Sequence, residues 1–106
     1  MKVSLFALAG LALLAAGAAK ADDDTMKLLQ KSGCTACHSI DKKVIGPAYK
    51  DVAAKYKADA GAEAKLFEKV KKGGSGVWGP VPMPPNAAVK DDDIKKMVHY
   101  IMGLKK

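Results

Sequence analysis

The sequence is poor in cross-linking and aromatic residues. Its 106 residues include two cysteines, one tryptophan and two phenylalanines. Two cysteines exclude the dense disulfide framework that stabilises many small secreted domains. A bridge between Cys34 and Cys37 would close a loop too short to restrict the unfolded chain appreciably. A domain of this size buries a limited core, so another group is expected to fill its interior.

The sequence also lacks an apolar run long enough to cross a membrane. The apolar run over residues 3–14 is shorter than the roughly 20 residues that a spanning helix needs. It follows Lys2 and precedes small residues that end in Ala19-Lys20-Ala21, which is typical of a secretory signal peptide. We expect residues 1–21 to be cleaved on export and residues 22–106 to form one domain without stable membrane insertion. The alternative is that this apolar run is retained as a membrane anchor.

The exported domain is basic. Removal of residues 1–21 leaves 85 residues with 16 of the 18 lysines and all 11 acidic residues, a net charge of +5. This balance favours partners with acidic surfaces, although a lysine-rich face can also be merely solvated. Export argues against a nucleic-acid partner.

Four segments have the spacing of amphipathic helices. Within the second, Tyr49, Val52, Ala53 and Tyr56 recur at i, i+3, i+4 and i+7. Acidic residues open the first and last segments and suit the helix dipole. The predicted helices cover residues 24–33, 47–57 and 62–72, and residue 91 to the C-terminal lysines. No segment predicts a strand, so the expected fold class is all-α.

Residues 73–89 form a long segment of different composition. Four glycines and four prolines alternate there with Trp78, Val81 and Met83, and no helical period survives. Because these apolar residues do not suit a solvated linker, we expect an ordered, Pro-rich loop.

The chemistry-bearing residues concentrate at Cys34, Cys37 and His38, in the pattern C-x-x-C-H. This is the attachment motif for c-type haem. Two thiols at this spacing can add to the two vinyl groups of one porphyrin, and the adjacent histidine can reach the iron. A thioredoxin-like disulfide would need a βαβ pattern, which the sequence lacks. Zinc would need four ligands, but His99 is the one further donor of the usual kind.

The second axial position of the iron has several candidates. His99 lies toward the edge of its helix's apolar stripe and is expected at the surface, whereas Met97 and Met102 are expected in the core and Met26 in helix packing. Met83 differs because the prolines around it restrict the backbone, so a rigid loop could hold its thioether as a ligand. The alternative is that Met83 only fills an apolar gap.

Three stretches carry a resemblance to a known family. "GCTACHSI", "VIGPAYKDVAAKY" and "GVWGPVPMPPN", with the amphipathic last helix, resemble the small bacterial class I cytochromes c, periplasmic monohaem proteins of denitrifying and related respiratory chains. The resemblance implies the compact class I fold of about four helices and an ordered Pro-rich loop around one covalently attached haem c. His38 and Met83 would be the axial ligands.

The resemblance also assigns residues around the haem. The Pro47 carbonyl would accept a hydrogen bond from the His38 imidazole, the Trp78 indole would donate to a haem propionate, and Asn86 would bond near the Met83 sulfur. Residue by residue, Pro47 could instead only start a helix, Trp78 could be plain core, and Asn86 could be a turn residue. Lys69 departs from the family, in which several relatives have arginine or histidine near a propionate. Because a lysine is a mobile point charge rather than a planar fork, the propionate pKa and the pH dependence of the potential do not carry over from those relatives.

Two protein ligands would leave the iron no vacancy for oxygen or peroxide, so the expected function is a soluble periplasmic electron carrier, a monomer and not an enzyme. Methionine opposite histidine raises the reduction potential. The rival functions are a gas-binding haem protein or enzyme, which the absence of arginine and of a second distal histidine disfavours, and a thiol redox protein. The family implies a membrane bc-type complex as donor and nitrite reductase or a terminal oxidase as acceptor.

Overall fold

The structure, a computed structural model, describes residues 22–104. The expected signal peptide, residues 1–21, lies outside the described residues, as do residues 105–106. Within residues 22–104, no helix has both the length and the apolar character that a membrane span requires.

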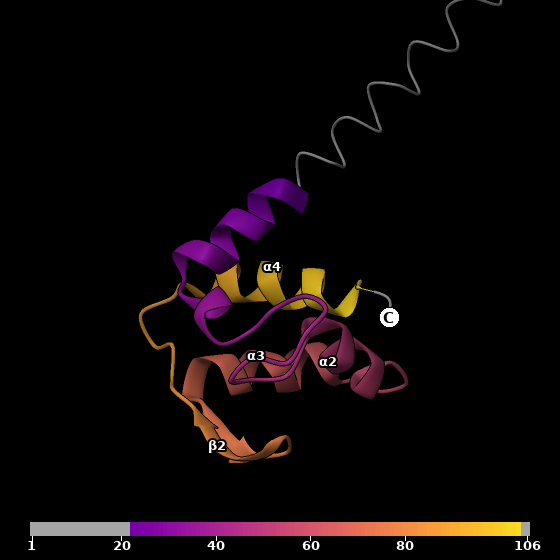
Figure 1. Ribbon diagram of the computed structural model, residues 1–106. Helices are drawn as coiled ribbons and strands as arrows, with labels where there is room; N and C mark the ends of the chain where they lie inside the picture. The colour runs from indigo at the N-terminus through magenta and orange to yellow at the C-terminus, as the bar shows by residue number, and fades with distance from the viewer. Residues whose placement is uncertain (1–21, 105–106) are drawn as a thin grey trace, which may run out of the picture.

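The described chain is mainly helical (Figure 1). Residues 22–31 are helical, and a 3₁₀ turn, η1, follows at Cys34–Ala36. The remaining elements are α2 (Tyr49–Tyr56), α3 (Ala62–Lys72), β1 (Gly74–Gly76), β2 (Gly79–Met83) and α4 (Asp91–Met102). The four predicted helices are therefore present.

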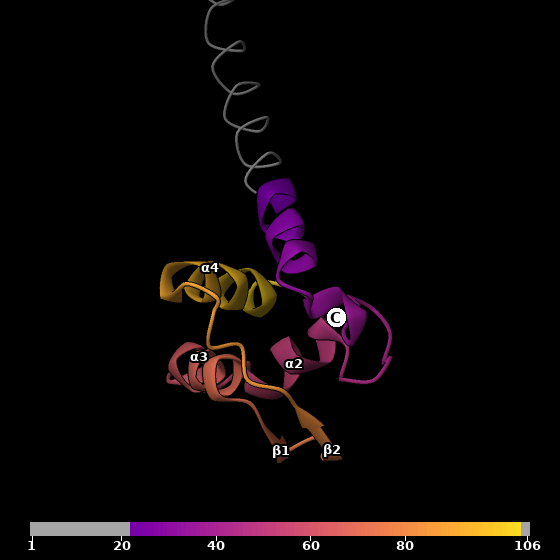
Figure 2. The ribbon, with the colours of Figure 1, turned by 90° about the vertical axis from the view of Figure 1, so that its left-hand side faces the viewer.

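Helix α4 is the centre of the packing. It lies between the helix over residues 22–31 and the pair α2 and α3 in both ribbon views (Figures 1 and 2). Its buried face packs against the first helix and α2; the buried cluster comprises Leu29, Tyr49, Val52, Ile94, Met97, Val98 and Ile101. Each 100 Å² of apolar surface buried in this way contributes about 2.5 kcal/mol.

The side chains of α4 follow the predicted pattern. Met97 is 3% exposed and Met102 is partly buried against the core, as expected. The His99 side chain is 81% exposed, so its predicted surface position is confirmed.

Helix α2 begins later than predicted. Pro47 precedes it by two residues, and the N-cap Ala48 is extended, with φ −61° and ψ 143°. The first free N–H groups of the helix find partners in the preceding loop, because Tyr49 N donates to Ser39 O at 2.9 Å and Lys50 N to Ile40 O at 3.1 Å. The start of α2 is thus tied to the segment that carries the C-x-x-C-H motif.

The prediction that the chain has no strand was wrong. Within residues 73–89, β1 and β2 pair as an antiparallel hairpin, with Gly74 opposite Met83 and Gly76 opposite Gly79. Glycine and proline supply no alternation of polar and apolar side chains, so the hairpin leaves no strand pattern in the sequence. Prolines are tolerated in β2 because an edge strand has N–H groups outside the ladder. The hairpin lies on the far side of α3 from α4 (Figures 1 and 2).

Candidate functional site

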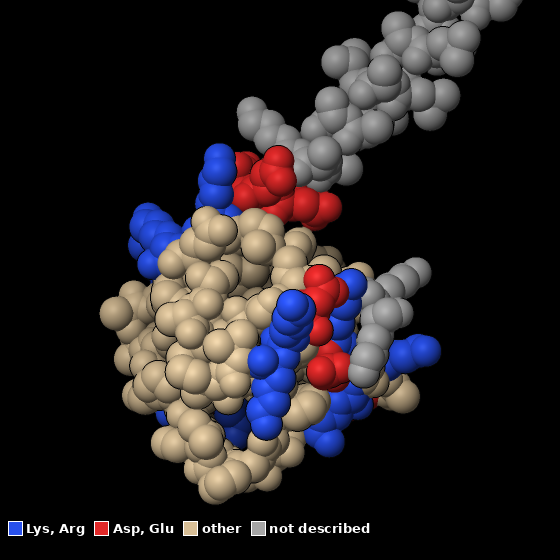
Figure 3. Space-filling view, viewed as in Figure 1, with Lys and Arg blue, Asp and Glu red and all other residues tan. Residues whose placement is uncertain are grey.

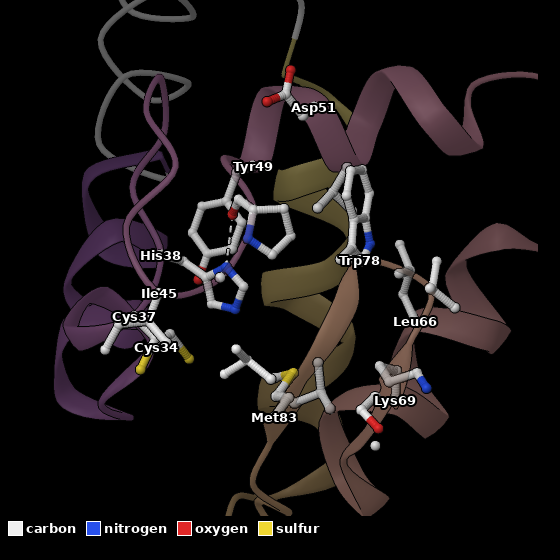
Figure 4. A pocket seen from close by; sticks show the side chains of 18 of the residues that line it. Cys34, Cys37, His38, Ile45, Tyr49, Asp51, Leu66, Lys69, Trp78 and Met83 are labelled. Carbon is white, nitrogen blue, oxygen red and sulfur yellow. Dashed lines mark hydrogen bonds between the residues drawn. The ribbon is translucent and has the colours of Figure 1, made fainter.

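A cavity of about 320 Å³ lies between the C-x-x-C-H segment and the hairpin. Figure 4 shows the two cysteines on one side, Trp78 and Lys69 on the other, and Met83 facing the ring of His38. Core residues of α4, among them Met97 and Val98, also line the cavity. Its size falls in the range of cofactor pockets, which are mostly apolar with a few convergent polar groups.

The cysteines reach the same wall through a tight turn. Gly33 precedes η1 with φ +79°, a conformation that favours glycine. The N–H groups of Cys37 and His38 both donate to Cys34 O, at 3.2 and 3.0 Å. Burial raises the pKa of the Cys34 thiol. A redox-active cysteine needs the opposite shift, toward the thiolate, so this wall is unlike a thioredoxin-type site.

The His38 ring is held on several sides. Its Nδ1 lies 2.8 Å from the Pro47 carbonyl oxygen, and the Tyr49 ring stacks on it with centroids 5.0 Å apart and planes at 19°. Since a carbonyl only accepts, Nδ1 carries the proton, and the lone pair remains on Nε2. Figure 4 shows that second ring nitrogen on the side of Met83.

Gly46 closes the remaining side of the imidazole. A Cβ at this position would lie 2.5 Å from His38 Cε1 and 2.9 Å from Nδ1. The ring therefore packs directly on the Gly46 backbone. The sequence pattern placed Tyr49 only on the apolar face of the second predicted helix and gave Gly46 no role at the site. A glycine and an aromatic residue on either side of Pro47 were the signal that could have identified both.

Met83 ends β2, and its sulfur points toward the cavity (Figure 4). Gly73, at φ +73°, supports the segment from behind, because a Cβ there would lie 2.5 Å from Met83 O and 2.8 Å from Pro85 N. Asn86 ties the following residues to α3. Its backbone N and its Nδ2 both donate to Val70 O, at 3.1 and 3.0 Å.

Asn86 is not among the residues that line the cavity. Its Nδ2 also donates to Pro84 O at 3.2 Å, so the amide braces the segment after Met83. The expected contact between Asn86 and the Met83 sulfur stays a prediction.

Away from the cysteines, the cavity is lined by charged side chains of both signs: Lys69, and Asp51, which lies above Trp78 in Figure 4. Trp78, 43% exposed, lines the cavity, with Lys55 Nζ 5.6 Å from its ring centroid. Lys69 also lines it, and its Nζ would be 2.8 Å from a Cβ at Gly74. A ligand with an apolar body and an anionic end suits this arrangement.

The donor set fits a covalently attached haem. Two neighbouring thiols, an imidazole with Nδ1 already bonded, and a thioether on the other side meet around one apolar cavity. Zinc fits less well, since residues 22–104 contain no cluster of three or more His, Cys, Asp or Glu side chains able to hold a metal ion.

Comparisons with known proteins agree with the site. The cytochrome c family matches residues 23–105. Cytochrome c-551 of Allochromatium vinosum is 61% identical over 77 residues, which cover 73% of this chain and 82% of that protein. Cytochrome c-552 of Nitrosomonas europaea is 51% identical over 94 residues, 89% of this chain and 88% of that protein. The crystal structure of wild-type Nitrosomonas europaea cytochrome c552 aligns with a TM-score of 0.74 at 49% identity, and covers 76% of this chain and 99% of that one.

The chain therefore belongs to the cytochrome c family, and it is a class I electron-transfer protein, not an enzyme, with one covalently attached haem c.

Proposed function

We propose that the protein is a periplasmic carrier of single electrons whose haem is attached through Cys34 and Cys37 and ligated axially by His38 and Met83. The observation that carries this proposal is the cavity with both thiols and the imidazole on one side and the Met83 thioether facing the imidazole. The haem iron supplies the chemistry, by alternating between its ferrous and ferric states. The protein supplies the ligands and the apolar surroundings.

His38 is the proximal ligand in this proposal. The hydrogen bond from Nδ1 to Pro47 O fixes the tautomer and raises the basicity of Nε2 as a metal ligand. Stacking on Tyr49 and packing on Gly46 hold the ring plane. A ring held on three sides changes little between oxidation states, which keeps the reorganisation that accompanies electron transfer small.

Met83 is the distal ligand. The hairpin base at Gly73 and the bonds of Asn86 to α3 hold its backbone. A thioether favours the ferrous state and raises the potential. If His38 and Met83 both hold the iron, oxygen and peroxide would have no position to occupy, so electron transfer is favoured over gas binding.

Pro47, Trp78 and Lys69 complete the surroundings. Pro47 would influence the iron only through the hydrogen bond that its carbonyl accepts from His38 Nδ1. The Trp78 indole N–H would donate to a haem propionate, and Lys69 would supply a mobile positive charge on the same side of the cavity. An ionised carboxylate is a strong acceptor for an indole N–H, so this pairing would give the Trp78 ring one defined orientation at the cavity wall.

The partners are redox proteins of the periplasmic respiratory chain: a bc-type complex as donor, and nitrite reductase or a terminal oxidase as acceptor. Residues 1–21 direct export and are then removed, and the carrier works as a monomer. Four of the residues that line the cavity are exposed and apolar; Ile45, Val77, Trp78 and Val81 are 43–62% exposed. In Figure 3, Lys side chains lie along parts of the edge of a broad uncharged area, with acidic residues beside some of them.

The salt dependence of partner association tests whether the exposed lysines contribute to docking. Steering by exposed lysines acts over a Debye length of about 8 Å at physiological salt. We expect stopped-flow association with a purified redox partner to slow as ionic strength rises. A rate that does not change with salt would show that the apolar side chains, rather than the lysines, determine docking.

The haem assignment is tested on protein expressed in the periplasm with haem-attachment machinery. The pyridine haemochrome spectrum should report one haem per chain bound through two thioethers, and the reduced protein should exclude CO. A Cys34→Ala, Cys37→Ala variant is the matched control and should retain no covalent haem. Non-covalent haem in the parent would refute the attachment, and CO uptake by the reduced parent would refute the six-coordinate site.

A further inference from the structure

The hairpin that closes the cavity is anchored to the helices at its base. There, Gly73 packs against Met83 O, and Asn86 N donates to Val70 O and Lys71 O at 3.1 and 3.2 Å. Trp78 lies at the other end, in the two-residue turn between β1 and β2. A hairpin fixed at one end can swing at the other, so the position of the indole depends on what holds the turn.

At the turn, the structure records a contact between Trp78 and α2. Lys55, in the last turn of α2, places Nζ 5.6 Å from the centroid of the indole ring. This distance is within the approximately 6 Å at which an ammonium group is attracted to an aromatic face, and tryptophan is the strongest such face. The contact joins an exposed side chain of α2 to the end of the hairpin that lies away from its base.

We infer that Lys55 is a positioning residue: its ammonium group holds the Trp78 ring at the cavity wall and thereby keeps the indole N–H directed to the haem. This inference deepens the proposed function and rests on it. Lys55 does not touch the haem or the iron, and its effect passes through Trp78. Lys69 differs from it because Lys69 lines the cavity directly.

The expected effect is modest but measurable. An exposed cation–π contact contributes about 0.5–1 kcal/mol, so its loss should raise the population of displaced indole by about two- to fivefold. Trp78 is the one tryptophan of the chain. In the holoprotein, energy transfer to the haem quenches an indole strongly at short range, so the weakly quenched component of the fluorescence decay reports the displaced population.

The test compares Lys55→Gln, Lys55→Arg and Lys57→Gln holoproteins. Lys57 is the residue that caps α2 at its C-terminal end, so Lys57→Gln removes an equal charge nearby. The weakly quenched component should increase two- to fivefold in Lys55→Gln. Lys55→Arg, which keeps a cation for the ring, should behave as the parent, and so should Lys57→Gln. An unchanged decay in Lys55→Gln, or an equal increase in Lys57→Gln, overturns the inference.

The midpoint potential separates this inference from the proposed function. The shift in potential and in its pH profile caused by Lys55→Gln should disappear in a Trp78→Leu background if Lys55 acts through the ring. A shift that persists in Trp78→Leu marks a direct charge effect and overturns the inference. If the fluorescence responds but neither the potential nor its pH profile changes, the contact between Lys55 and the Trp78 ring is supported. The same result would refute the indole–propionate hydrogen bond of the proposed function.

Discussion

Gly46→Ala is the substitution whose effect follows most directly from the geometry. The added Cβ would lie 2.5 Å from His38 Cε1, whereas ordinary contacts begin at 3.4 Å. The ring or the loop must therefore retreat by about 0.9 Å. No positive φ is involved at Gly46, so the effect is steric and arises at the imidazole.

Two contributions set the expected loss in the free energy of unfolding. Overpacking of a tightly packed site costs about 1–3 kcal/mol. Displacement of the ring also weakens the 2.8 Å hydrogen bond to Pro47, at about 0.5–1.5 kcal/mol. The expected loss in the free energy of unfolding is about 1.5–4.5 kcal/mol, and at roughly 4–8 °C per kcal/mol the Tm should fall by at least about 6 °C.

The assay is guanidinium and thermal unfolding of the holoprotein, together with the midpoint potential, which should shift because the hydrogen bond from the imidazole to Pro47 O is weakened. Gly61→Ala is the matched control, since a Cβ there meets nothing closer than 3.5 Å. A Gly46→Ala protein that loses no more stability than Gly61→Ala, with an unchanged potential, would refute the packing of His38 on Gly46.

Three further predictions concern the other cavity residues. Met83→Ala should keep the haem attached and allow the reduced protein to bind CO. It should also lower the midpoint potential by a substantial fraction of the ~0.8 V that axial ligands can span. If the potential is unchanged and CO is still excluded, another side chain is the ligand. Trp78→Phe should shift the potential and its pH profile and cost about 1–3 kcal/mol, and an unchanged profile would contradict the propionate contact. Burial raises the pKa of Tyr49 above its ordinary value of 10. Above that pH the phenol ionises in the unfolded chain but stays neutral in the folded one, so the free energy of unfolding should fall by up to about 1.4 kcal/mol per pH unit as pH rises. Tyr49→Phe should remove this contribution in denaturation measured between pH 9 and 11. An equal alkaline loss of stability in both proteins would exclude it.

The helices were predictable because their signals are local. Spacing of apolar residues and acidic first turns located α3 at Ala62–Lys72 and the start of α4 at Asp91 as the structure has them. Burial of Met97 and exposure of His99 followed from the same periodicity. The hairpin was missed because its pairing depends on glycine backbone conformations and on packing at Gly73, and neither leaves a side-chain pattern.

The sequence by itself determined the cofactor and predicted its points of attachment, because the two thiols and the imidazole need only a five-residue segment to come together. It also determined that Met83 sits in a conformationally restricted segment. Only the tertiary structure decided that Met83 faces His38, that Gly46 and Tyr49 hold the imidazole, and that Lys55 meets Trp78. The physical reason is that each of these contacts joins separate segments of the chain, whose approach is fixed by packing around α4 rather than by local spacing.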